Sequence, residues 1–235
     1  MSTALLLLLS LQNILALEYS AKVEPLHHYT ISASTSGSVI FSNEDLEGKV
    51  ASSLPIIKLD NVIEQLNLTT QEKTYQNQKI IYDIKKKNYD RIKKMKSKSD
   101  AEKDAEKIAL FTQASTLLSL SLNIETLKDT LSKKVITSPN MYIDKLYVKK
   151  GNYVTPGMKL LEAYDISGSR ITLFVHKDEI TQIHNKDIMV NHKKSDYTID
   201  KIFKTTDSSY ITAYKVELIG PAPTRFSNIV NITFE

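Results

Sequence analysis

The chain has 235 residues, of which 41% are hydrophobic, and its 31 Lys and Arg against 27 Asp and Glu give a formal net charge of +4. This charge is too small to indicate a nucleic-acid partner, and no Arg-rich or aromatic-interleaved basic patch occurs outside residues 85–98. The absence of cysteine excludes disulfides, thiolate nucleophiles, zinc-thiolate sites and the lipid-bearing cysteine of a bacterial lipoprotein, and it suits a protein of the bacterial periplasm.

Residues 1–17 have the pattern of a signal peptide. An unbroken apolar run from Ala4 to Leu9 continues less regularly to Ala16, and polar residues begin at Glu18. The run is shorter than the about 20 apolar residues that a membrane-crossing helix needs, so we predict cleavage after Ala16. Because no Lys or Arg precedes the run, an uncleaved N-terminal anchor is the alternative. In either case the rest of the chain is expected outside the cytoplasm.

The middle of the chain is predicted to be helical. All six glycines and all six prolines lie outside residues 56–138, and these two residue types are the strongest breakers of regular structure. The segment is also rich in Lys, Glu, Gln, Leu and Ala, which favour helices. Asn61 and Glu64 form a cap-like start, and Lys133 and Lys134 suit the negative pole at the far end. We therefore predict helix across residues 61–133.

The charges of this segment predict that it folds back on itself. Residues 85–98 are strongly basic, whereas the next residues carry the acidic side chains of Asp100, Glu102, Asp104 and Glu106. A reversal near residues 97–99 places these opposite charges side by side, which a continuous helix would not do. The prediction is an antiparallel helical hairpin whose arms are about 50 Å long, at about 1.5 Å per residue.

Apolar periodicity predicts how the two arms meet. In the returning arm a heptad pattern runs through Leu110, Ala114, Leu117, Ser121, Ile124 and Leu131. The outgoing arm has a less regular apolar stripe, diluted near its middle by polar residues and made of Val62, Ile63, Leu66, Ile80, Ile81, Ile84, Ile92 and Met95. We expect both sets to pack in the coiled-coil contact between the arms.

The flanks of the hairpin are predicted to be β structure. Residues 171–175, 210–218 and 230–234 alternate apolar with polar residues or are rich in β-branched and aromatic residues. Glycines and prolines between these segments mark turns. We expect short strands in small barrels or sandwiches, and the fold class is therefore α+β.

Residues 137–160 resemble the second half of a lipoyl/biotinyl-like domain. In that fold a strand enters a tight turn at a glycine, a valine returns to the core, and a second glycine allows the next turn. Gly151, Val154, Gly157 and Leu160 fit this layout. Upstream, residues 36–39, 46–50 and 55–60 resemble the first half. The resemblance implies one lipoyl-like domain that the helical hairpin splits.

A split lipoyl-like domain with an inserted hairpin, followed by a β-barrel, is the architecture of the periplasmic adaptor or membrane fusion proteins, which include haemolysin-D-like proteins. The chain resembles this family over roughly residues 25–235, and residues 171–183 are similar to the start of the family's barrel. The resemblance implies lipoyl-like halves at 25–60 and 134–166, a hairpin at 61–133, and a β-barrel at 167–235 with an abbreviated membrane-proximal part.

The resemblance also implies a partner-binding tip. Family members that dock onto outer-membrane channels often carry an Arg, then a Leu four residues later, then a Ser. Arg91, Met95 and Ser99 stand in this order here, with the Ser earlier than is usual. The alternative for Arg91 is an ordinary ion pair with Asp100 or Glu102.

The function implied by the resemblance is that of a periplasmic adaptor subunit, associated with the inner membrane, in a tripartite efflux or export system. The implied partners are an inner-membrane transporter of the RND or ABC type, between which the sequence does not choose, an outer-membrane channel of the TolC type, and further copies of the chain in a ring. No enzyme activity, cofactor or metal site is expected, because no catalytic motif occurs and the five histidines lack ligand spacing.

Two other functions remain open at this point. One is a secreted coiled-coil scaffold without a transport role. The other is a carrier domain with a biotinylated or lipoylated lysine, since Met158-Lys159 resembles an attachment motif. We expect Lys159 on the closing strand of the β fold, however, whereas an attachment lysine projects from an exposed tight turn.

Overall fold

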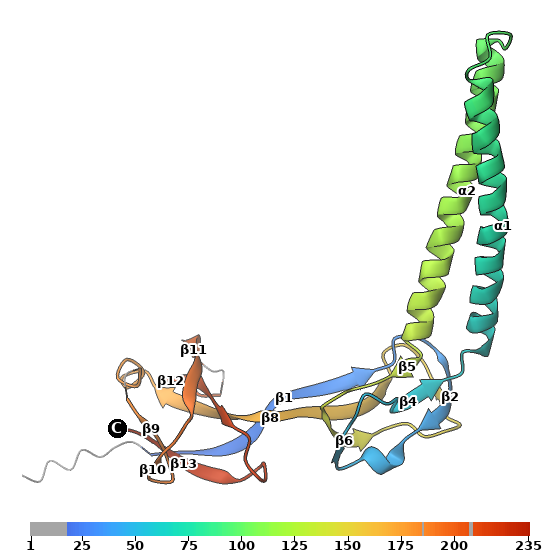
Figure 1. The fold of residues 1–235 in the computed structure, drawn as a ribbon. Helices are drawn as coiled ribbons and strands as arrows, with labels where there is room; N and C mark the ends of the chain where they lie inside the picture. Colours follow the sequence, from blue (N-terminus) through green and yellow to red (C-terminus); the bar gives the residue numbers. More distant parts are fainter. Residues whose placement is uncertain (1–17, 185, 207–208) are drawn as a thin grey trace, which may run out of the picture. The chain divides into compact units, whose positions relative to one another are not determined.

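A computed structural model describes residues 18–184, 186–206 and 209–235, so the predicted signal peptide lies outside the described residues. Within them the chain is α+β, as predicted, with two long helices that stand between β-strands in the order of the sequence. The helices project from the strands that flank them (Figure 1). The chain divides into two compact units. The central unit is Thr30–Glu162, and the terminal unit combines the chain up to Tyr29 with Ala163–Glu235. Two strands, β1 (Tyr19–Ser32) and β8 (Lys159–His176), run from one unit into the other.

The strands of the central unit come from both sides of the helices. They are β2 (Gly37–Ser42), β3 (Lys49–Val50), β4 (Ile57–Leu59), β5 (Val135–Ile136), β6 (Tyr142–Leu146) and β7 (Tyr153–Val154), with a short 3-10 helix at Glu44–Leu46. β4 pairs with β5, β2 with β7, and β3 with β6, all antiparallel. Each of these pairs joins a strand before the helices to a strand after them, so both sides build one small β fold.

Two glycines make the tight turns of this fold. Gly151 has φ of 94° and Gly157 has φ of 86°, a region of backbone conformation that residues with a side chain avoid. Between and after these turns, Val154 and Leu160 are fully buried. The four residues therefore lie where the predicted strand and turn layout requires them.

The helices α1 (Val62–Ile92) and α2 (Asp100–Ser132) lie side by side and run in opposite directions (Figure 1). We call them the helix pair. At 1.5 Å per residue they are about 45 to 50 Å long, and residues 93–99 join them at the end far from the strands. Among the described residues, neither of these helices nor any other is apolar enough over a sufficient length to cross a membrane.

On α1 the contact between the helices differs from the predicted one. Apart from Ile92, the residues of the predicted stripe face solvent; Val62, for example, is 67% exposed and Ile84 is 55% exposed. The less exposed residues recur instead at alternating spacings of four and three, and we call this line and its counterpart on α2 the seam. On α1 it comprises Glu64, Leu68, Gln71, Tyr75, Gln78, Tyr82, Lys85, Tyr89 and Ile92. Ile92 lies in the seam as predicted. For the other residues the prediction was wrong because it counted aliphatic residues, whereas Tyr, Gln and Lys can bury a ring or stem and keep a polar end at the edge.

On α2 the seam is closer to the predicted one. Leu110, Leu117, Ile124 and Leu131 lie in it as predicted, whereas the predicted Ala114 and Ser121 lie beside it and are partly exposed. It also includes residues that the apolar pattern omitted, namely Lys103, Glu106, Gln113, Leu120 and Leu127.

Gln113 is a polar residue inside the seam, with only 7% of its surface exposed. Its side-chain amide donates hydrogen bonds to Gln78, at 2.7 Å to Oε1 and 3.2 Å to the carbonyl oxygen. A buried polar pair is satisfied only when its two residues stand opposite one another, so this contact favours one alignment of the helices.

The predicted helix start at Asn61 and Glu64 is wrong in its details. The side chain of Asn61 makes no capping bond, and Asp60 accepts a hydrogen bond from the backbone N–H of Val62 at 3.1 Å instead. The carboxylate of Glu64, in the first turn of the helix, binds the amine of Lys134.

The terminal unit is an antiparallel sheet structure built around long strands. It adds β9 (Ile188–Val190), β10 (Lys193–Lys194), β11 (Thr198–Thr206), β12 (Ala213–Pro221) and β13 (Ile229–Phe234), in the order β10-β9-β13-β1-β8-β12-β11. Alternate residues of β8 and β12 enter its core, among them Ile171, Leu173 and Leu218. The strand predicted to begin at residue 210 begins at Ala213, and Tyr210 stacks on the ring of Phe174.

Candidate functional site: the tip of the helix pair

The three residues predicted to bind a partner lie together at the far end of the helix pair. Arg91 is in the last turn of α1, Met95 is in the connection, and Ser99 directly precedes α2. We call residues 91–99 the tip. Arg91 and Met95 are exposed to solvent, Met95 with 40% of its surface. The tip therefore combines an exposed cation with an exposed apolar side chain.

Ser99 has a structural task at the start of α2. Its hydroxyl accepts a hydrogen bond from the backbone N–H of Glu102, and the Glu102 carboxylate accepts one from the N–H of Ser99 at 2.9 Å. This reciprocal arrangement is a capping box, which satisfies two backbone donors that the helix leaves free. The spacing of Ser99 and Glu102 in the sequence is that of a capping box, and it indicates a structural role for the serine that the family resemblance does not.

Hydrogen bonds hold the carboxylate of Glu102 firmly in its charged form. The amine of Lys98 donates to it at 2.8 Å, and the backbone and hydroxyl of Ser99 donate as well. These bonds lower the pKa of Glu102 to about 2, with the Lys98 bond as the largest cause. The carboxylate of Glu102 at the start of α2 therefore has its hydrogen-bond partners in the adjacent residues Lys98 and Ser99.

Arg91 does not form the ion pair considered as the alternative for it. In the described part of the chain its guanidinium donates to the side-chain oxygen of Asn88 at 2.7 Å. The acidic candidates are paired elsewhere, Asp100 with Lys103 at 3.2 Å and Glu102 with Lys98. The charge of Arg91 is consequently not neutralised by α2.

Ion pairs between the helices lie away from the tip. The basic and acidic stretches are joined by the ion pair between Lys98 and Glu102, close to the reversal itself. Other ion pairs between the two arms among the described residues join Glu72 to Lys128 and Glu64 to Lys134, away from the tip. The tip keeps a surplus of positive charge, from Arg91, Lys93, Lys94 and Lys96.

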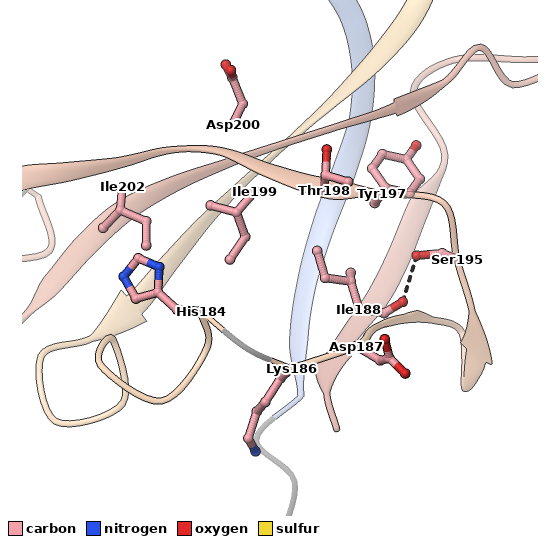
Figure 2. Close-up of a pocket in the computed structure, with 10 residues that line it drawn as sticks. All are labelled: His184, Lys186, Asp187, Ile188, Ser195, Tyr197, Thr198, Ile199, Asp200 and Ile202. Carbon is pink, nitrogen blue, oxygen red and sulfur yellow. Dashed lines mark hydrogen bonds between the residues drawn. The ribbon is translucent and has the colours of Figure 1, made fainter.

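The terminal unit contains a pocket of about 640 Å³, which is a second candidate for a functional site (Figure 2). It is lined by His184, Lys186, Asp187, Ile188, Ser195, Tyr197, Thr198, Ile199, Asp200 and Ile202. Several of its polar groups are already bound within the protein. Ser195 donates to the carbonyl of Ile188 at 2.7 Å, Lys186 donates to the carbonyl of Phe234, and Asp187 pairs with Lys194. The described residues include no cluster of three or more His, Asp or Glu that could hold a metal ion. The tip is therefore the stronger candidate.

Lys159, the residue considered for biotin or lipoate attachment, is the first residue of β8 and so lies on a strand, as predicted. Its amine lies 3.6 Å from the carboxylate of Glu162 and over the ring of Tyr147. An attachment lysine projects from a turn, so this position does not favour the carrier function.

Comparison with known proteins gives matches by structure and not by sequence. No protein-family model matches the sequence, and no curated protein matches it either. A putative efflux transporter from Bacteroides eggerthii matches with a TM-score of 0.68 at 15% identity, covering 93% of this chain and 68% of that one. MacA from Actinobacillus actinomycetemcomitans matches with a TM-score of 0.67 at 18% identity, covering 93% and 78%. The membrane fusion protein Spr0693 from Streptococcus pneumoniae R6 matches with a TM-score of 0.66 at 10% identity, covering 93% and 98%. The chain therefore shares its fold with a putative efflux transporter, MacA and a membrane fusion protein, which confirms, for the fold, the resemblance predicted from the sequence.

Proposed function

We propose that the chain is a periplasmic adaptor subunit of a tripartite efflux or export system. It links an inner-membrane transporter, of the RND or ABC type, to an outer-membrane channel of the TolC type. The observation that carries this proposal is the fold shared with a putative efflux transporter, MacA and a membrane fusion protein along 93% of the chain. Fold alone does not define function, so the proposal is tested on the tip.

Under this proposal the strands before and after the helices, which pair with one another, are the two halves of a lipoyl-like domain, at 25–60 and 134–166. The helix pair is the antiparallel coiled-coil hairpin at 61–133. Residues 167–235 stand for the β-barrel with a short membrane-proximal part. The signal peptide at 1–17 directs the chain to the periplasm, where it associates with the inner membrane.

The mechanism is mechanical. Lipoyl-like domains of several copies form a ring, and their helix pairs, each about 45 to 50 Å long, reach toward the outer membrane. Arg91 and Met95 contact the channel, Arg91 through its unneutralised charge and Met95 through its exposed thioether. Ser99 acts indirectly, because its capping box sets where α2 begins and so shapes the connection that carries Met95.

Site-specific photocrosslinking tests this assignment. A photoreactive residue at Met95 is expected to capture an outer-membrane channel in native cells, whereas the same residue at the exposed Leu54, in the central β fold, is not. Arg91→Glu is expected to abolish the Met95 adduct, while Lys79→Glu, the same charge reversal far from the tip on α1, leaves it intact. Equal capture from Met95 and Leu54 would refute the tip as the docking site.

Affinity purification from detergent-solubilised membranes tests the link to a transporter. An adaptor is expected to bring down an inner-membrane transporter, and the identity of that protein decides between the RND and ABC types. A secreted coiled-coil scaffold without a transport role would yield neither a transporter nor a channel adduct.

A further inference from the structure

A groove of about 600 Å³ adjoins the pocket of Figure 2 in the terminal unit. It lies between strand β11 and residues 177–184, the segment that follows β8. The groove and the pocket share Ile202 and His184, which Figure 2 shows close to one another. We call this groove the β11 groove.

The walls of the β11 groove are largely apolar. Ile180 and Ile202 line it and pack against the core of the terminal unit. Phe203 is 38% exposed and Tyr214 is half-buried, so two aromatic rings of the groove are partly open to water. An apolar group that covers these side chains removes their surface from water, which favours binding.

The charged residues that line the β11 groove are both lysines, Lys177 and Lys204, and His184 lines it as well. Both lysines are exposed, and within residues 18–184, 186–206 and 209–235 their amines form neither a hydrogen bond nor an ion pair. A lysine amine carries three donors, and an imidazole carries at least one. The groove therefore sets positive charge and hydrogen-bond donors beside apolar surface.

The acids nearest in sequence do not neutralise this charge. Asp178 and Glu179 follow Lys177 directly, but neither lines the groove. The Asp178 carboxylate lies 3.3 Å from the ring nitrogen Nδ1 of His176, and Glu179 accepts a hydrogen bond from the hydroxyl of Tyr19. An acidic group that enters from outside would find the amine of Lys177 without a partner.

Strand β11 is the last strand in the order of its sheet, so an added peptide strand is the first occupant to consider. Two features of β11 disfavour it. The strand carries Lys201 and Lys204, and its pairing with β12 shifts register at two places. Lysines and irregular pairing keep an edge strand from adding a further strand. A small molecule needs no regular backbone pairing and suits the groove better.

We propose that the β11 groove binds a small amphipathic anion, a molecule with an aromatic or alkyl body and one sulfonate or carboxylate group. The body lies on the two isoleucines and the two aromatic rings, and the acidic group lies between Lys177 and Lys204. This site goes beyond the proposed function, which is mechanical and needs no ligand.

Two fluorescent probes of the same shape test the site in the purified full chain. Anilinonaphthalene sulfonate carries an acidic group, and phenylnaphthylamine has the same aromatic body without it. The chain has no tryptophan, so Phe203→Trp places a single reporter in the groove, and energy transfer from it measures a probe bound there. The sulfonate is expected to bind about tenfold more tightly than the uncharged probe. The exposed Tyr153→Trp, in the central unit, is the control position and is expected to show no saturable transfer.

Removal of the charges provides the second readout. Lys177→Gln combined with Lys204→Gln is expected to weaken binding of the sulfonate about tenfold and to leave the uncharged probe unaffected. Lys79→Gln combined with Lys150→Gln removes the same charge from the central unit and is expected to change neither.

Equal affinity for the two probes, or sulfonate binding that survives the loss of both groove lysines, would overturn the site. Transfer from Tyr153→Trp but not from Phe203→Trp would overturn it as well, because the probe would then lie elsewhere. Urea unfolding shows whether each variant is folded, and Tyr214→Trp is the second reporter if Phe203→Trp is not. Capture of the channel at Met95 is a separate measurement, and its outcome does not bear on this site.

Discussion

The amine of Lys134, just beyond α2, lies 2.5 Å from a carboxylate oxygen of Glu64 in the first turn of α1. The same amine donates to the carbonyl of Asp60 at 2.7 Å, and the residue is only 3% exposed. Two residues 70 positions apart are thereby joined where the helix pair meets the strands. Lys134 thus ties the end of the returning helix to the start of the outgoing one.

Replacing this lysine is expected to destabilise the central unit. Lys134→Met removes the charge and leaves the Glu64 carboxylate and the Asp60 carbonyl without their donor, at a cost of about 2 kcal/mol. Lys133→Met is the matched control, because the pair of Lys133 with Asp129 is exposed and contributes about 0–1 kcal/mol. Urea unfolding of both variants measures the difference. Equal losses from the two substitutions would contradict the role given to Lys134.

The same pair predicts a dependence of stability on pH. The hydrogen bond from Lys134 is the largest cause that lowers the pKa of Glu64 below its ordinary value. A carboxyl whose pKa is lower in the folded state stabilises that state above the unfolded pKa, and the effect is lost as the pH falls through the folded pKa. The stability advantage of the wild type over Glu64→Gln is therefore expected to be full at neutral pH and to shrink in acid. Unfolding curves at a series of pH values check this, and an advantage independent of pH would refute it.

The buried pair of Gln78 and Gln113 makes a different prediction. Gln113→Ala removes the hydrogen bonds and packing at this point of the seam and is expected to cost about 1–2 kcal/mol. Replacing both glutamines by leucine removes donor and acceptor together, so that double variant is expected to be as stable as the wild type or more stable. Urea midpoints of the single and double variants decide this. A double variant less stable than Gln113→Ala would show that the pair contributes more than its alignment of the helices.

The positions of the helices could be predicted from the sequence because the signals that set them are local. Glycine and proline act on the backbone where they stand, so their absence from residues 56–138 was sufficient to expect helices there. The turns at Gly151 and Gly157 were predictable for the same reason, since each glycine adopts a backbone conformation that other residues avoid.

The contacts of the helices were harder to predict because they depend on which side chains meet across space. Periodicity of aliphatic residues selected Ile80 and Ile84, which face solvent, and missed Tyr75 and Tyr82, whose rings lie in the seam. The bond between Lys134 and Glu64 joins parts of the chain that are 70 positions apart, and no local sequence pattern predicts such a contact. At the tip the order of Arg91, Met95 and Ser99 was readable, but the partner of each side chain was not.

Ser99 allows the capping and docking roles at the tip to be separated. Ser99→Ala removes the capping box and is expected to cost about 1 kcal/mol, whereas Ser99→Asp keeps a side-chain acceptor at the start of α2. If Ser99 acts by shaping the connection, the Met95 adduct with the channel weakens in Ser99→Ala and survives in Ser99→Asp. Ser97→Ala, in the same connection but outside the cap, is the control and is expected to change neither stability nor adduct. An adduct lost in Ser99→Asp although thermal unfolding shows no loss of stability would mean that the serine hydroxyl itself contacts the channel.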